Sequence, residues 1–303
     1  MEKWLSVRQA AAVAQYNFRL WHRNPRIWMT FFLAFIMCFL LSDKVMSFAV
    51  KYDCSMQFFE PFIWTFSDSN SILLASLLMF FLFADMPFVS GGTPFFLMRT
   101  SRRVWLIGQF VYIMAATLLY MLFVLVSTGL LCMKHSFLGN MWSETAARLG
   151  YSSAGARLAV TASRKTMEMT TPYACTAVIF VLMLLYTLLL VFVMMVFNLY
   201  KGQMAGMIAA TSFSVYGFLL SPDIFKVIFH LEENETYKAN VIVGWLSPLN
   251  QAAFERHNFG YDLLPTVAQS VILFLLLLMI CLGFAHRSIR EYSFVFTGTE
   301  GEI

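Results

Sequence analysis

Residues 104–133 form a 30-residue stretch without a charged side chain, and this stretch limits the folds open to the chain. A helix of about 20 apolar residues crosses the hydrocarbon core of a bilayer, whereas a soluble helix of this length needs a polar face. Hydrophobic residues make up 59% of the chain and charged residues 13%, against roughly half and a quarter in soluble domains. The chain is therefore predicted to be a membrane protein with several spans.

Six apolar segments are long enough to be spans, and we expect each of them to be a helix. They cover residues 27–50, 71–88, 104–133, 173–200, 204–220 and 263–285. An even number of spans places both chain ends on the same side of the membrane. Residues 1–303 are expected to form one all-α transmembrane domain, with the segments 134–171 and 221–262 on the external side.

The charge of the connecting segments predicts which side is cytoplasmic. Basic residues gather at 19–26, 99–103, 201 and 286–290, whereas acidic residues gather at 53–68 and 223–235. Lys and Arg are enriched in cytoplasmic loops, so both chain ends are expected in the cytoplasm. Basic residues within 134–171 disagree with the external placement of that segment, although the rule weakens in longer loops.

Residues 1–26 are predicted to form an amphipathic helix at the membrane surface. Apolar residues recur on one side at Val7, Ala11, Ala14, Phe18 and Trp21, and basic residues on the other include Arg8, Arg19 and Arg23. Such a helix lies in the headgroup plane with its basic residues toward anionic lipid, or it packs against a partner protein. Asn24 and Pro25 end the helix and direct the chain into the first span.

The segment 84–109 joins the second and third spans and is predicted to be a short structured hairpin at the cytoplasmic surface. The residues that mark it are Asp85, Pro87, Gly91, Gly92, Pro94, Arg99, Arg102 and Arg103. Prolines and paired glycines interrupt helices, and a basic cluster holds a short loop on the cytoplasmic side. We interpret this hairpin as the place where another protein exerts force on the spans.

The apolar segments contain few ionisable groups. This argues against an enzyme or an ion-coupled carrier, because both need such groups at depth in the membrane. Asp85 is a candidate, but its position beside Pro87 near a span end favours a capping role. No HExxH, GxSxG or phosphate-binding GxxxxGK[ST] motif occurs in the sequence. We therefore predict no catalytic residue, metal site or cofactor on this chain. The net charge of +4 gives no argument for a nucleic-acid partner.

These features together resemble the permease subunit of type-2 ABC exporters, as found in many Gram-positive bacteria. The resemblance is carried by Arg23-Asn24-Pro25 before the first span, by Met98–Gln109, and by Leu246–Asn250 before the last span. It covers nearly the whole chain. The resemblance implies a coupling helix within Asp85–Arg103 that docks on a separate ATP-binding subunit, and it makes residues 1–26 the connector helix.

The resemblance also implies the composition of the transporter. Two permease chains, identical or homologous, and two ATPase subunits would make one transporter in the bacterial plasma membrane. ATP and magnesium would bind the partner subunit, and this chain would not be an enzyme itself. The residues that would contact the ATPase are Asp85, Pro87, Gly91, Gly92, Arg99, Arg102 and Arg103. The charge-free spans suit a hydrophobic or amphipathic cargo such as a lipid, a peptide or a drug-like molecule.

Three other interpretations stay open on the sequence alone. The chain could be a stand-alone secondary carrier or channel, an intramembrane enzyme, or an anchor or sensor that signals through an ATPase partner. A carrier predicts buried ionisable residues or matched broken helices, and an enzyme predicts convergent His, Glu or Asp side chains. Glu255-Arg256-His257 is a dense ionisable triplet near a membrane face, and we interpret it as an external helix end.

Overall fold

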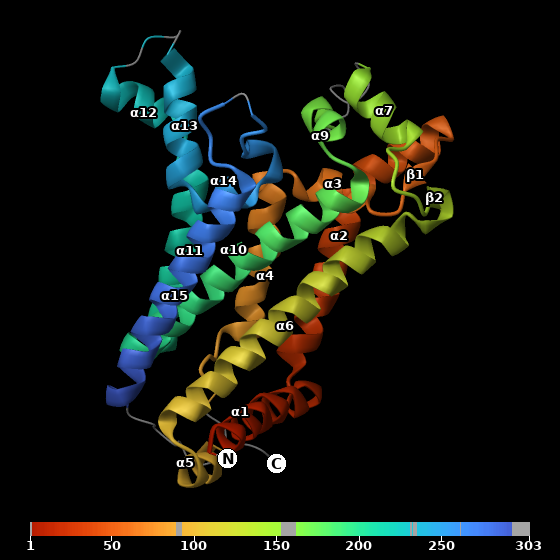
Figure 1. The fold of residues 1–303 in the computed structure, drawn as a ribbon. Helices are drawn as coiled ribbons and strands as arrows, with labels where there is room; N and C mark the ends of the chain where they lie inside the picture. The colour runs from red at the N-terminus through yellow and green to blue at the C-terminus, as the bar shows by residue number, and fades with distance from the viewer. Residues whose placement is uncertain are drawn as a thin grey trace.

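The computed structural model describes residues 2–88, 93–152, 162–230, 232, 235–260 and 262–292. Within these ranges the fold is a helical bundle (Figure 1), with two short strands, Met56–Gln57 (β1) and Ser136–Phe137 (β2), that pair in parallel. In the described part of the chain, four helices are long and apolar enough to cross a membrane, or up to six if each bent pair is one span. The predicted all-α fold is therefore confirmed, with four to six helices that are candidate membrane spans.

The four long helices are α2 (Pro25–Tyr52), α6 (Arg102–Leu131), α10 (Pro172–Lys201) and α15 (Val267–Glu291). The bent pairs are α3 (Glu60–Phe66) with α4 (Ser69–Phe83), at 94°, and α11 (Gln203–Leu219) with α12 (Pro222–Phe229), at 71°. α4 has 15 residues and α11 has 17. At 1.5 Å per residue these helices are about 22 and 26 Å long, somewhat less than the roughly 30 Å hydrocarbon core.

The remaining elements gather at the two ends of the bundle, which we name by their places in Figure 1. The lower end carries α1 (Glu2–Arg19), the 3-10 helix η1 (Trp21–Arg23), α5 (Thr93–Arg99) and the last turn of α15. The upper end carries η2 (Met133–His135), α7 (Glu144–Tyr151), α9 (Arg164–Met169), α13 (Thr236–Leu246), α14 (Pro248–Ala252) and η4 (Phe254–Arg256). The strands, α3 and α12 also lie at the upper end.

Two helices have ends that differ from the boundaries of the predicted spans. The second span was expected to reach residue 88, but α4 ends at Phe83, because Pro87 offers no backbone N–H and disfavours a helical conformation at Met86. The sixth was expected at 263–285, but α15 begins at Val267. Its start is set by a capping box in which Thr266 and Gln269 exchange hydrogen bonds.

α1 packs along the lower part of α6 and presents small or polar residues to it. The residues of α1 that this contact buries are Ala10, Val13, Ala14 and Asn17. A Cβ atom at Gly108 of α6 would lie 2.7 Å from the Cβ of Val13, so the close approach requires a glycine. On the side predicted to be apolar, Val7 is 65% exposed and Ala11 is also exposed, whereas Ala14 is buried against α6. Small residues face α6 because they let the two backbones approach closely.

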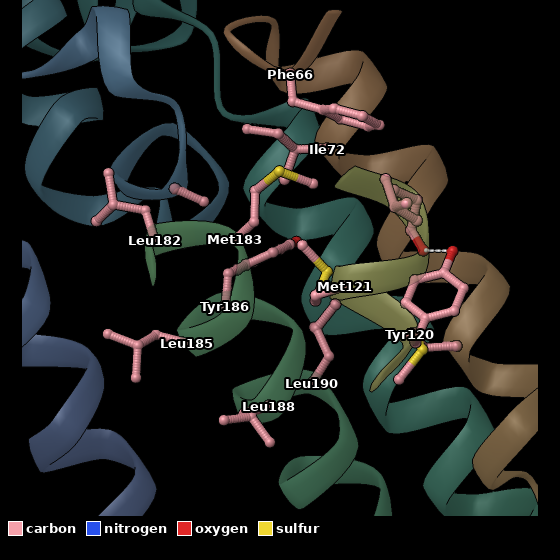
Figure 2. Packing of buried hydrophobic residues seen from close by; sticks show 14 of the residues in the cluster. Phe66, Ile72, Tyr120, Met121, Leu182, Met183, Leu185, Tyr186, Leu188 and Leu190 are labelled. Atoms are coloured by element: carbon pink, nitrogen blue, oxygen red, sulfur yellow. Dashed lines mark hydrogen bonds between the residues drawn. The ribbon is translucent and has the colours of Figure 1, made fainter. Parts of the chain in front are cut away.

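α10 lies at the centre of the bundle, where it contacts α4, α6, α11 and α15. Its most apolar window is 67% buried, against 17% for α15, so the core forms around α10. Figure 2 shows Tyr186 of α10 near Met121 of α6. In the same view Tyr120 donates a 2.9 Å hydrogen bond to the carbonyl of Ala75 in α4. Among the described residues, the buried acidic or basic side chains are Glu60 and His257, both at the upper end.

Candidate functional site

A short helix at the lower end exposes apolar side chains beside arginines. On α5, Phe95 is 65% exposed and Met98 is 75% exposed. They lie three positions apart, so they share one face of the helix. Arg99 ends α5, and the exposed Arg103 follows in the first turn of α6. Aromatic residues, Met and Arg are enriched at protein interfaces, so this composition is typical of a docking surface. We call Phe95, Met98, Arg99 and Arg103 the α5 surface.

The lower end as a whole is strongly basic. Its exposed basic residues are Arg8, Arg19, Arg23, Arg99, Arg102, Arg103, Lys201, Arg287 and Arg290. Where the structure describes side chains at this end, the carboxylates are Asp85 and Glu291. The resulting positive potential favours an acidic protein surface or anionic lipid headgroups as the neighbour of this end.

Asp85 lies in the link between α4 and α5, where it forms an ion pair with Arg26 in the first turn of α2. The side chains of Arg26 and Asp85 are 43% and 33% exposed. An ion pair whose side chains are this exposed to solvent contributes at most about 1 kcal/mol to the stability of the fold. The carboxylate is thus engaged within the chain, and it holds the link against the start of α2.

The next residues of the same link are held by α10. Met86 and Pro87 are both buried, and the Met86 carbonyl accepts a 2.6 Å hydrogen bond from Nδ2 of Asn198. The amide of Asn198 also packs against α11, because a Cβ atom at Gly206 would lie 1.9 Å from its Oδ1. The link before α5 therefore contacts α2 through Asp85 and contacts α10 through Met86.

α1 and the following η1 connect α5 to α6 by side-chain contacts. Gln9 donates to the carbonyl of Arg99 at 3.3 Å, Asn17 donates to Oε1 of Gln109 at 3.0 Å, and Trp21 donates to the Tyr112 hydroxyl at 2.8 Å. The ring of Phe18 also packs on Tyr112, with centroids 4.9 Å apart. Phe18 and Trp21 are therefore partly buried between helices, and a displacement of α5 reaches α6 both along the chain and through α1.

The residues expected to contact a partner separate into different environments. Arg99 at the end of α5 and Arg103 in the first turn of α6 are both exposed, whereas Pro87 is buried. Arg102 donates hydrogen bonds to the carbonyls of Arg290 and Tyr292, at 3.2 and 3.1 Å, and so holds the end of α15.

Two of the expected contact residues, Gly91 and Gly92, lie outside the described residues. The three arginines expected on the surface of the N-terminal helix are exposed at the lower end; these are Arg8, Arg19 and Arg23. Their exposure fits contact with anionic lipid or with an acidic partner.

Sequence reasoning missed the apolar part of the α5 surface. A signal was present, since Pro94 at the start of a short segment is typical of the first turn of a helix, and Phe95 and Met98 then share a face. It also missed the hydrogen bond between Asn198 and Met86, which are 112 residues apart. No local pattern identifies a pair at that separation.

A second feature of the bundle is an open apolar groove of about 340 Å³ in the upper half. Leu122 and Leu125 of α6 line one side, and Phe180 and Val181 of α10 line the other. Nothing charged lines the groove, so it suits an acyl chain or another apolar group.

The described side chains include no group of three or more His, Cys, Asp or Glu placed to hold a metal ion. All five cysteines are free. No protein-family model, curated protein or solved structure matches this chain. The function is therefore inferred from the geometry and charge of the molecule.

Proposed function

We propose that this chain is the permease subunit of an ATP-driven ABC exporter whose ATPase is a separate subunit. The observation that carries the proposal is the α5 surface, a short helix between two membrane helices that exposes Phe95 and Met98 beside arginines. An exposed aromatic and a methionine on one helix face fit a groove of a partner protein. The arginines beside them favour an acidic rim on that groove.

The proposal places the lower end in the cytoplasm of the cell that holds the protein in its plasma membrane. The exposed basic residues of α1, α5 and the end of α15 support this side, because Lys and Arg are enriched on cytoplasmic segments. The six spans of the proposal are α2, α4, α6, α10, α11 and α15. The shorter helices α4 and α11 fit a bilayer that thins locally around them.

The contacts of α5 give a physical route from a partner to the spans. ATP binding would close two ATPase subunits and shift α5. The shift would reach α2 through the pair of Asp85 with Arg26, and α10 through the hydrogen bond of Met86 with Asn198. The ATPase supplies the differential binding energy that biases inward-facing and outward-facing states.

A second permease chain, identical or homologous, completes the proposed transporter. α2 packs on α4 and α4 packs on α11, so these three helices form one continuous face. Apolar side chains that this face leaves exposed include Phe32, Phe35 and Phe39 of α2, Phe81 of α4 and Ile208 of α11. Asp43 lies four residues after Phe39 and shares its side of α2, so a pathway between two such faces is mainly apolar and suits a hydrophobic or amphipathic cargo, such as a lipid, a peptide or a drug-like molecule.

The test is the ATP turnover of the reconstituted transporter. The triple variant Phe95→Ser, Met98→Ser, Arg103→Glu is compared with the control Met204→Ser, Arg287→Glu, which changes exposed side chains of the lower end on α11 and α15. We expect the α5 variant to lose cargo-dependent stimulation of ATP hydrolysis while the control keeps it. Equal stimulation in both variants would remove α5 from the mechanism.

A stand-alone carrier is the second candidate, and the two bent helix pairs are the observation that favours it. Carriers place broken helices at the middle of the membrane, in matched positions of inverted halves. Here both bends, at 94° and 71°, lie at the upper end of the bundle. Asp43 and Lys44, which interrupt the apolar run of α2, are exposed on its surface. These placements favour the permease over the carrier.

A further inference from the structure

A cavity of about 250 Å³ with both polar and apolar lining lies at the upper end, between the upper ends of α4 and α11 and the helices α13 and α14. Asp68 and Arg256 place opposite charges at its wall, and Asn70, Asn240 and Asn250 add polar groups. Pockets for drug-sized ligands enclose about 300–1,000 Å³, so this cavity suits a smaller group.

Both charges at the cavity wall are exposed. Asp68 precedes α4 at the N-cap position, but its side chain makes no capping hydrogen bond. Arg256 ends η4 and is exposed. Neither residue belongs to any of the ion pairs found in the described part of the chain. A carboxylate and a guanidinium are therefore both open to a ligand at one cavity.

The neighbouring Glu255 adjusts the charge balance of the cavity. Burial raises the pKa of Glu255 to about 7, Arg256 opposes this shift, and Asp68 adds to it. A raised pKa weakens the negative charge of Glu255 near neutral pH, so Asp68 and Arg256 set the charge of the cavity wall. A wall with one cation and one full anion favours a ligand that carries both charges over a ligand with a net negative charge.

The cavity lies at the upper ends of α4 and α11, which are spans under the proposed function, so it would lie near the membrane surface. Phe218 of α11 lines it and is 50% exposed, and the adjacent Leu219 is 61% exposed. Beyond the bend, α12 exposes Ile224, Val227 and Ile228, which share one helix face and fit the lipid interface. A molecule with its polar group in the cavity can therefore keep apolar chains in the adjacent lipid.

We propose that this cavity binds the zwitterionic phosphate–amine headgroup of a membrane lipid, with Arg256 binding the phosphate and Asp68 binding the ammonium group. The planar guanidinium forms paired hydrogen bonds with phosphate oxygens, and a carboxylate is the natural partner of an ammonium group. A lipid with phosphate but no amine leaves Asp68 unpaired beside a second negative charge, so the site rejects it. The binding does not require an ATPase partner.

The test uses the full chain in mild detergent and native mass spectrometry of bound lipid. Phosphatidylethanolamine and phosphatidylglycerol with identical acyl chains are the two probes. We expect the first to bind at least about tenfold tighter, which corresponds to roughly one charge-assisted hydrogen bond. Equal binding of the two lipids by the unmodified chain would overturn the proposal.

Single substitutions test which part of the headgroup each charged side chain binds. Arg256→Gln is expected to weaken phosphatidylethanolamine binding about tenfold, since it removes the charged phosphate contact. Asp68→Asn is expected to abolish the preference between the two lipids. Arg148→Gln, which changes an exposed arginine of α7 at the same end, is the control and should change neither result. Unchanged binding in both Arg256→Gln and Asp68→Asn would contradict the assignment.

Two further measurements test whether the ligand occupies this cavity and whether it is a lipid. Asn240→Trp keeps every charge and fills the cavity from the exposed side of α13, so it should also lose the bound lipid. Retained binding in this variant would place the lipid elsewhere. Soluble glycerophosphoethanolamine offers the same phosphate–amine group without acyl chains. Weak competition by this probe supports a lipid as the ligand, whereas competition at equal concentration would overturn the lipid as the source of the headgroup.

Discussion

The two ends of the bundle differ in how far their charged side chains form ion pairs. At the upper end, four ion pairs join neighbouring elements or turns: Arg148–Glu144, Lys165–Asp262, Lys226–Asp223 and Lys238–Glu235. Among the described residues of the lower end, one ion pair is found, Arg26–Asp85. The many exposed arginines there have few carboxylates near them. The upper end thus pairs several of its charges within the chain, whereas the lower end presents a positive surface that favours an acidic or anionic neighbour.

The two ends also differ in how their short elements are held. At the upper end, Glu60 of α3 is buried and accepts three hydrogen bonds, from the amide of Gln57 and from the amide and hydroxyl of Ser143. At the lower end, α5 meets α1 through the Gln9 hydrogen bond to a backbone carbonyl and through a ring contact of Tyr16 with Phe96. The upper end is fixed by buried polar contacts, whereas the contacts of α5 with α1 are made by side chains that solvent partly reaches, and we expect α5 to move more readily.

The largest expected effect is at Glu60. Glu60→Ala leaves three buried donors without an acceptor, and we expect a loss of about 3–5 kcal/mol in the free energy of unfolding. Glu144→Ala removes a carboxylate of the exposed pair with Arg148 at the same end, and it should cost less than about 1 kcal/mol. Chemical unfolding of both variants in detergent gives the comparison. Equal losses would show that the buried contact does not fix the upper end.

Gly108 tests whether α1 belongs to the bundle. Gly108→Ala adds a methyl group where Val13 leaves no space, and we expect a net loss of about 1–2 kcal/mol. Gly283→Ala in α15 meets nothing within 4 Å, so the better helix propensity of Ala should raise stability slightly. Thermal unfolding measures both variants. The same small gain in each would mean that α1 is not held against α6.

Glu255 gives the upper end a pH dependence. Its pKa rises from the usual 4.5 to about 7 because the side chain is partly buried and loses contact with water. The folded chain therefore keeps a proton that the unfolded chain releases above pH 4.5, and this contribution to stability is lost as the pH rises through about 7. Glu255→Gln should raise stability by about 1–2 kcal/mol at pH 8, with little effect at pH 5.

The measurement is the unfolding temperature of the variant minus that of the unmodified chain, at both pH values. Taking this difference removes the contribution of His257, whose pKa is lowered by burial. A lowered histidine pKa acts in the opposite direction, since its contribution is complete above the usual 6.5 and is lost on acidification. A difference between Glu255→Gln and the unmodified chain that stays constant with pH would contradict the assignment.

The smallest expected effect is at the ion pair of the lower end. A double-mutant cycle of Arg26→Gln with Asp85→Asn should give a coupling energy below about 1 kcal/mol, because both side chains are in contact with solvent. A coupling energy of several kcal/mol would make this pair a fixed joint. The contrast between a fixed upper end and a movable α5 would then be lost.

The sequence predicted the long helices well because an uninterrupted apolar run leaves few alternatives in a membrane. Residues 104–133 were expected as a span, and α6 covers Arg102–Leu131. Pairings between distant residues could not be predicted. Ser143 reaches Glu60 across 83 positions, and its partner is decided by how the helices pack. The spacing of Phe95 and Met98 indicates that they share one helix face. Their exposure to solvent could be learned only from the packed structure.

The central claim is that the α5 surface binds an ATPase subunit. The most direct measurement is purification of the tagged full-length chain from its native host in mild detergent, followed by quantitative mass spectrometry of the proteins that accompany it. The unmodified chain, the variant Phe95→Ser with Met98→Ser, and the control Met204→Ser are compared. We expect an ATP-binding cassette subunit in near-equal amount with the unmodified chain and the control, and its loss from the α5 variant. Recovery of the unmodified chain alone, or an equal amount of ATPase with the α5 variant, would contradict the claim.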